Sequence, residues 1–175
     1  MNSIFQPSSA LLQAAYAHCA GMASSMLARD GQFDPALFLI GQPAQGQDFQ
    51  SCRLAGAGAQ AMRAFHGSEE AAGKLATFIR ASLTSSTREY AALQAQIGPV
   101  VLAVHVFPAA LAVQEQVTPL EGSTPVFQPD GRQQYLVVAL HTLQGIDMAL
   151  CPLLRDSAGQ LTAQIVPIEL THCLP

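Results

Sequence analysis

The C-terminal part of the chain carries long apolar runs separated by turn signals. These runs span residues 99–107, 133–142, Ile146–Arg155 and 161–170. Runs of this length that are rich in valine, leucine and isoleucine, and bounded by glycine, proline and aspartate, are typical of β-strands. We therefore expect them to form the sheet of the protein as an antiparallel meander.

The N-terminal part begins with a helical pattern. Between residues 10 and 29, apolar side chains recur three or four positions apart, as in Leu12, Tyr16 and Cys19. Ser8 and Ser9 precede this pattern, and a serine at that place can accept a hydrogen bond from the free amide groups of the first turn. The pattern predicts a helix over residues 10–29 with one apolar stripe.

A strand-like pattern and further helical patterns follow this helix. Residues 36–41 and 49–54 are short apolar runs on either side of a stretch rich in glycine, glutamine and proline, which predicts a hairpin. Ser68 and the two glutamates after it predict the start of a second helix over residues 68–83. Residues 87–96 predict a further, shorter helix that ends at the following glycine.

The order of these elements predicts an α+β fold, α-β-β-α-(α)-β-β-β-β. Residues 110–117 fit either a strand or a loop, and residues 120–128 fit either a loop or an edge strand. We expect one domain over residues 1–175, with an antiparallel, strongly twisted sheet of about five or six strands. The helices are expected to pack together on one face of this sheet.

Each long strand of the predicted sheet has one bulky apolar face and one mixed face, because side chains alternate along a strand. We expect the bulky faces to pack on the helices. The mixed faces share a row of small residues with polar side chains around it, and we expect a shallow groove there that suits a ligand, a partner helix or a second sheet. The row is Ala103, Ala139 and Ala149, and the candidate binding residues around it are His105, Tyr135, His141, Asp147, Cys151 and Arg155.

The loop between the second and third of these strands decides which residues face each other. A two-residue loop would place His141 opposite Ile146 and mix the two faces. A three-residue loop over residues 143–145 keeps the faces sorted, and such loops favour glycine at the position that Gly145 would occupy. We therefore predict the three-residue loop, with His141 opposite Asp147.

This predicted pair has two interpretations. A carboxylate beside a histidine raises the pKa of the imidazole and fixes its tautomer, so His141 and Asp147 could act as a base with its orienting group. We favour a structural cross-strand pair, because no nucleophile is specified beside it. His105 and His141 suggest a metal only weakly, since the sequence has no HxH, HExxH or CxxC motif, and Cys151 has no thiolate-stabilising motif. We predict no metal and no cofactor.

The low content of charged residues is the unusual feature of the composition. Only 11% of the residues are charged, whereas about 25% is typical. Such a chain leaves more neutral or apolar surface exposed, which favours a homo-oligomer, with a dimer preferred, or a site for a protein partner or small ligand. The alternative is a surface made of glutamine, serine, threonine and alanine. The net charge is −4 and Lys74 is the only lysine, so we predict neither nucleic-acid nor membrane binding.

The sequence indicates a compartment but no reaction. The first residues have neither a positively charged region nor an apolar segment of the signal-peptide kind, so we expect a cytoplasmic protein whose four cysteines are free thiols. We predict a non-enzymatic interaction domain that self-associates through the mixed face or the sheet edge. The alternative is a small-molecule binding protein, or an enzyme, that uses the groove.

Overall fold

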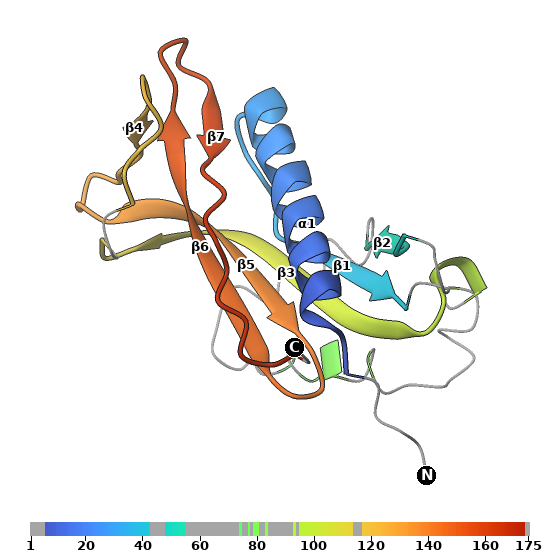
Figure 1. Ribbon diagram of the computed structural model, residues 1–175. Coiled ribbons are helices and arrows are strands. Elements are labelled where there is room, and N and C mark those ends of the chain that lie inside the picture. Colours follow the sequence, from blue (N-terminus) through green and yellow to red (C-terminus); the bar gives the residue numbers. More distant parts are fainter. Residues whose placement is uncertain are drawn as a thin grey trace.

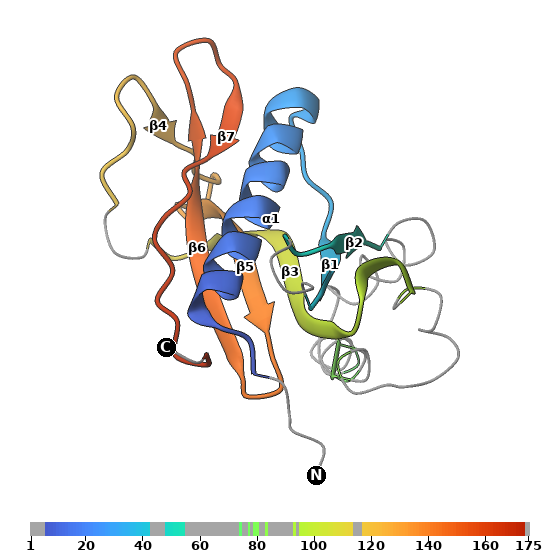
Figure 2. The same cartoon turned by 45° about the vertical axis from the view of Figure 1, so that its right-hand side comes forward.

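A long helix lies across one face of a curled antiparallel sheet in the computed structural model (Figure 1). The structure describes residues 6–42, 48–54, 74, 77, 79–80, 83, 93, 95–113 and 117–173. The predicted fold class, an α+β fold with an antiparallel sheet and a helix packed against it, is confirmed. Figure 2 shows the helix on the same side of the sheet from a second direction.

The helix α1 spans Ser9–Asp30 and begins and ends as its sequence predicts. The Oγ of Ser8 accepts a hydrogen bond from the amide of Leu11 at 3.2 Å, which satisfies one free donor of the first turn. At the other end, Gly31 takes the left-handed conformation with φ of 71°, and its amide donates to the carbonyl of Leu27 at 2.8 Å. The buried stripe of α1 contains the residues predicted for it, including Leu12, Tyr16 and Cys19.

The sheet has seven strands, all paired antiparallel. Their order is β2-β1-β3-β5-β6-β4, and β7 pairs with β6. Strand β3 extends farther toward the C-terminus than predicted, whereas β2 and β7 are shorter than predicted. The bounds are β1 Ala36–Gly41, β2 Ser51–Arg53, β3 Val100–Leu111, β4 Thr124–Pro125, β5 Gln133–His141, β6 Ile146–Arg155 and β7 Leu161–Ala163.

The core has two parts, one on each face of the sheet. The larger part lies between α1 and side chains such as Phe38, Val104 and Val138. The smaller part lies on the opposite face near β1 and contains Ile79 and Ile97. The predicted helices over residues 68–83 and 87–96 fall mostly outside the described residues, and the described residues of both segments are helical. The described helical residues Ile79, Leu83 and Leu93 therefore pack on one corner of the face opposite α1.

The predicted register between β5 and β6 is wrong. The amide of Thr142 donates to the carbonyl of Gly145 at 2.9 Å, which closes a two-residue turn. As a result His141 lies opposite Ile146, and Asp147 lies opposite Leu140. A shift of one residue turns every side chain of β6 to the other face of the sheet.

The cause of this inversion is the close approach of α1 to β6. The hydroxyl of Tyr16 lies 3.3 Å from the Sγ of Cys151, so only small side chains fit beneath the helix at this place. Ala149 and Cys151, which the sequence placed on the mixed face, are the small residues that lie there, and both are buried. The larger residues Ile146, Met148 and Leu150 consequently face away from α1, whereas Leu153, farther along the strand, is buried on the α1 side with Cys151.

The last predicted strand, over residues 161–170, is mostly an irregular segment. After β7 ends at Ala163, the amide of Gln164 donates to the carbonyl of Pro152 at 2.9 Å. Pro152 has no N–H to return, and Pro167 has none either, so the ladder does not continue. Residues 164–173, called the C-terminal strap here, run beside β6 and along α1 instead (Figures 1 and 2). The hydroxyl of Tyr16 donates to the carbonyl of Val166 at 2.5 Å and holds the strap to the helix.

Candidate functional site

The sheet face opposite α1 is the candidate functional site, and we call it the open face. Alternation along the paired strands places the following residues on it: His105 and Phe107 of β3; Tyr135, Val137, Ala139 and His141 of β5; and Ile146, Met148, Leu150, Pro152 and Leu154 of β6. None of these side chains is an Asp, Glu, Lys or Arg. Met148 is 58% exposed and Ile146 is 49% exposed. The inversion of β6 therefore makes this face more apolar than the sequence predicted.

Two histidines lie on the open face. The ring of His105 is buried and lies 4.6 Å from the ring of Phe107, centroid to centroid. The His141 ring lies 6.4 Å from that of His105. Burial lowers the pKa of His141 to about 4, so this imidazole is neutral at pH 7. Its Nε2 is buried and makes no hydrogen bond to any part of the chain that the structure describes.

Asp147, the predicted partner of His141, lies on the other face and holds the C-terminal strap. The backbone amides of Thr171 and His172 both donate to its carboxylate at 3.1 Å, and the Thr171 hydroxyl donates at 2.7 Å. The Nδ1 of His172 lies 3.0 Å from the same carboxylate. Burial alone would raise the pKa of Asp147, but these hydrogen bonds outweigh it and hold the pKa below its usual value. The predicted pair of His141 with Asp147 is thus replaced by a pair of His172 with Asp147.

Cys151 and Arg155 also lie away from the open face. Cys151 is buried under α1, where burial and the contact with its sulfur raise the pKa of the Tyr16 hydroxyl. Arg155 is exposed at the end of β6 and donates to the carbonyl of Gly159 at 2.9 Å across the following turn. Of the candidate residues, the structure brings only His105, Tyr135 and His141 together on the open face.

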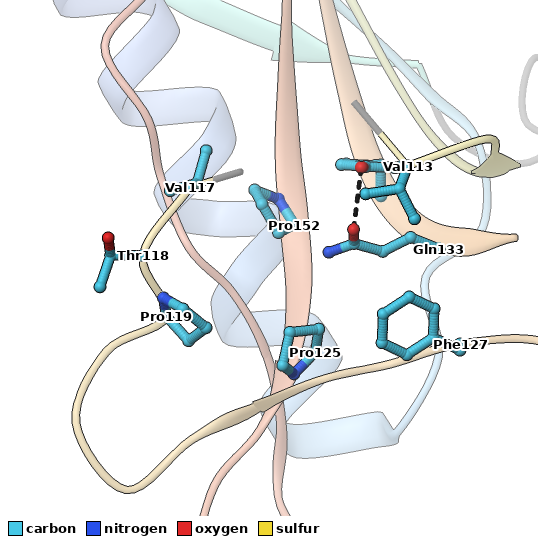
Figure 3. A pocket seen from close by; sticks show the side chains of 9 residues that line it. Val113, Val117, Thr118, Pro119, Pro125, Phe127, Gln133 and Pro152 are labelled. Atoms are coloured by element: carbon cyan, nitrogen blue, oxygen red, sulfur yellow. Dashed lines mark hydrogen bonds between the residues drawn. The ribbon is translucent and has the colours of Figure 1, made fainter. Parts of the chain in front are cut away.

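A pocket of about 360 Å³ opens at the end of the open face where β4 pairs with β6 (Figure 3). We call it the proline-walled pocket, because three prolines line it. At one side the hydroxyl of Tyr135 donates to the Oε1 of Gln133 at 3.0 Å. Its lining residues are Val113, Val117, Thr118, Pro119, Pro125, Phe127, Gln133, Tyr135 and Pro152.

Sequence reasoning identified Tyr135 but missed the rest of this pocket. Gln133 and Tyr135 are two positions apart on β5, so alternation could have placed both on one face. The opposite wall could not be found in this way, because β4 is only the two residues Thr124–Pro125. The bridge between Phe127 and Gln133 closes the wall, and a single bridge leaves no periodic signal in the sequence.

A second hollow of about 360 Å³ lies beside the turn between β5 and β6. His141, Gly145 and Ile146 line it from the sheet, and Ile79 and Arg80 line it from the helical segment on this face. The two hollows lie at opposite ends of β6, and the exposed side chain of Met148 lies between them along the strand. The open face is therefore an apolar strip with a hollow at each end.

Comparisons of the chain with known protein families, with curated proteins and with solved structures found no match. Within the described ranges, no cluster of His, Cys, Asp and Glu side chains is suited to hold a metal ion. No helix in the same ranges combines the length and the apolar character needed to cross a bilayer. The open face is therefore the feature of the molecule that bears on its function.

Proposed function

We propose that the protein is a non-enzymatic domain that forms a homodimer through the open face. The observation that carries this proposal is the pair of neighbouring exposed side chains, Ile146 and Met148, on an uncharged strand face. Monomeric proteins rarely expose contiguous apolar patches of large side chains. A second sheet packed on this strip would remove it from water.

The distribution of exposed apolar side chains supports the open face over other surfaces. Among the described residues, seven large hydrophobic side chains are exposed, and most of them lie on β6 or at the rim of the proline-walled pocket. Those are Ile146 and Met148 on the strand, and Val113, Val117 and Phe127 at the pocket. Concentration on one side of the molecule is typical of an interface.

The charge of the open face favours a second copy of the chain as its partner. In a twofold dimer, each residue near the axis meets its own copy, so a charged residue there would face a like charge. The strand residues of this face include no charged side chain, so the two copies would meet without repulsion. The low charge content of the whole chain agrees with this interpretation.

The sheet edge, which the sequence left as an alternative interface, is less suited to pairing. The C-terminal strap runs along the outer edge of β6 and bonds to Pro152 and Asp147. At the other side of the sheet, β2 pairs with β1 over three residues. Covered or very short edges resist strand addition from another chain. We therefore assign the interface to the open face. We also propose that the protein is cytoplasmic and that its thiols remain reduced.

The proposal is tested by the substitution Met148→Glu. We expect the wild type to be a dimer at micromolar concentration, and the variant to dissociate with a dimer Kd raised about 30-fold or more, because a buried glutamate would meet its own copy. Sedimentation velocity across a dilution series measures this Kd. A far-UV circular dichroism spectrum equal to that of the wild type would show that the fold is retained.

Ile165→Glu is the matched control. Ile165 is 44% exposed but lies on the C-terminal strap rather than on the open face. We expect this variant to dimerise as the wild type does. A wild-type protein that stays monomeric at tens of micromolar, or an unchanged Kd for Met148→Glu, would contradict the proposal.

A further inference from the structure

We propose that the proline-walled pocket binds a small uncharged ligand with an aromatic body and a carbonyl acceptor, through the side-chain amide of Gln133. This role goes beyond dimerisation, because it assigns a ligand to the pocket at the β4 end of the open face. It would give the protein a ligand-binding activity of its own.

The Gln133 side chain is a buried donor that the protein itself orients. Gln133 is only 7% exposed, and its Oε1 accepts the hydrogen bond of the Tyr135 hydroxyl at 3.0 Å. This bond turns the other end of the amide, Nε2, toward the space beside Pro125 and Pro152 (Figure 3). No acceptor within the described residues takes a hydrogen bond from Nε2, and the atom is open to the pocket rather than enclosed.

A buried N–H group without a protein partner favours a ligand that supplies an acceptor. Water can reach this donor in the empty pocket. A ligand that displaces the water without supplying an acceptor leaves the donor unpaired at a cost of about 1–3 kcal/mol, whereas a ligand carbonyl that accepts its hydrogen bond avoids that penalty. Buried polar groups of this kind also provide specificity, because an analogue without the acceptor leaves them unpaired. The acceptor is therefore the feature that the pocket should discriminate.

The walls of the pocket determine the rest of the ligand. Apart from Thr118, Gln133 and the Tyr135 hydroxyl, the lining side chains are apolar, and none of those described is charged. A charged ligand would lose its hydration without gaining a counter-charge, so a neutral ligand is favoured. Flat apolar surfaces from Phe127 and the prolines suit an aromatic ring. A volume of about 360 Å³ is within the range of small-ligand sites.

The pocket is also largely preformed. Proline rings have a fixed backbone φ and almost no side-chain freedom, so Pro119, Pro125 and Pro152 lose little entropy when a ligand packs on them. Gln133 is already held by Tyr135. A preorganised site binds with a smaller entropic cost than one that must be assembled.

Acetophenone, an uncharged aromatic ketone, is the probe for this site, and ethylbenzene is its counterpart without the acceptor. Both are titrated into the ¹⁵N-labelled full chain, and side-chain amide resonances are followed by NMR. The Gln133 pair is assigned by its loss in Gln133→Met. We expect acetophenone to shift this pair saturably with a millimolar Kd, and to bind about tenfold more tightly than ethylbenzene.

Two variants separate the role of the amide from simple apolar packing. In Gln133→Met, where the backbone amides of Phe127 and Tyr135 report binding, we expect acetophenone to lose its advantage and to bind only as well as ethylbenzene. In Tyr135→Phe the amide keeps its donor but loses its orienting bond, so acetophenone affinity should fall several-fold while ethylbenzene affinity is unchanged. Backbone resonances of α1 check that each variant is folded. Met148→Glu should bind acetophenone as the wild type does, which separates this site from dimerisation.

Three results would overturn the proposal. Equal affinity of the wild type for acetophenone and ethylbenzene would make the pocket an unspecific apolar surface. No shift of the Gln133 amide at 20 millimolar acetophenone, a concentration on the order of ten times the expected Kd, would show that the pocket takes no such ligand. Binding of decaproline more than about a hundredfold more tightly than acetophenone would identify a site for extended peptides.

Discussion

Replacement of Asp147 by alanine is expected to lower the free energy of unfolding by about 3 kcal/mol. This carboxylate is nearly buried and receives hydrogen bonds from the amides of Thr171 and His172 and from the Thr171 hydroxyl. Hydrogen bonds to a charged group contribute about 1.5–3 kcal/mol each, and donors left without a partner add a penalty of their own. Because the bonds act on one segment, their losses are not additive.

Urea unfolding followed by far-UV circular dichroism measures this effect. Circular dichroism replaces tryptophan fluorescence as the probe, because the chain contains no tryptophan. Limited proteolysis provides a second measurement, because the variant should be cut first within the C-terminal strap. Asp130→Ala is the control. Asp130 also receives two hydrogen bonds, from Arg132, but the pair is exposed, so its loss should leave the unfolding midpoint near that of the wild type. Equal midpoints for Asp147→Ala and the wild type would show that the strap is not held by this carboxylate.

The contribution of Asp147 should also depend on pH in a defined direction. Its pKa in the folded protein is below the value of about 3.9 typical of an unfolded chain. Its stabilisation is therefore fully present above that unfolded value and is lost as the pH falls through the lower, folded pKa. The stability difference between wild type and Asp147→Ala should be constant above about pH 5 and should shrink below about pH 4.

The substitution Gly41→Ala is expected to destabilise the fold by about 3 kcal/mol or more. Gly41 ends β1 at an irregularity of the register with β3, and a Cβ there would overlap the backbone carbonyl of Ile97. The chain on both sides is also fixed. The amide of Gly41 donates to Gln50 at 3.0 Å, and the amide of Gln42 donates to Pro99 at 2.8 Å. A backbone clash between two bonded segments cannot be relieved by a change of side-chain rotamer.

Gly21→Ala is the matched control and should change the stability in the opposite direction. Gly21 lies in the middle of α1, and nothing lies within 4 Å of the position of an added Cβ. Alanine in place of a helix-interior glycine stabilises by about 0.5–1 kcal/mol, because it reduces the freedom of the unfolded chain. Thermal unfolding of the two variants measures both effects. A Gly41→Ala variant as stable as the wild type would mean that β1 and Ile97 are not packed as described.

The helix and the central strands were predictable from the sequence because their signals are local. The serine cap, the apolar stripe and the final glycine of α1 all lie within the helix or beside it. The apolar runs of β3, β5 and β6 are long enough to be strands in any arrangement. The antiparallel pairing of β5 with β6 follows from the short turn between them, whereas β3 is joined to β5 by a longer segment that contains β4.

The candidate site was predictable only in part. Alternation placed His105, Tyr135 and His141 on one face, and the pairing of β3 with β5 keeps them there. Asp147 was recognised as a residue that could hold a histidine. Its histidine is His172, twenty-five positions along the chain, rather than the neighbour across the turn. Local spacing carries no information about a partner at that distance.

The register of β6 depended on contacts that no local pattern contains. The two alternative turns before β6 differ by one residue, and sorting of bulky and mixed faces favoured the wrong one. What selects the observed turn is the packing of Tyr16 over Cys151 and the donors that the strap brings to Asp147. These contacts form only when Ala149 and Cys151, the small residues of β6, face α1. Local propensity and periodicity thus determined which segments are helix and strand, whereas long-range contacts determined which side of β6 is exposed, and with it the open face and its pocket.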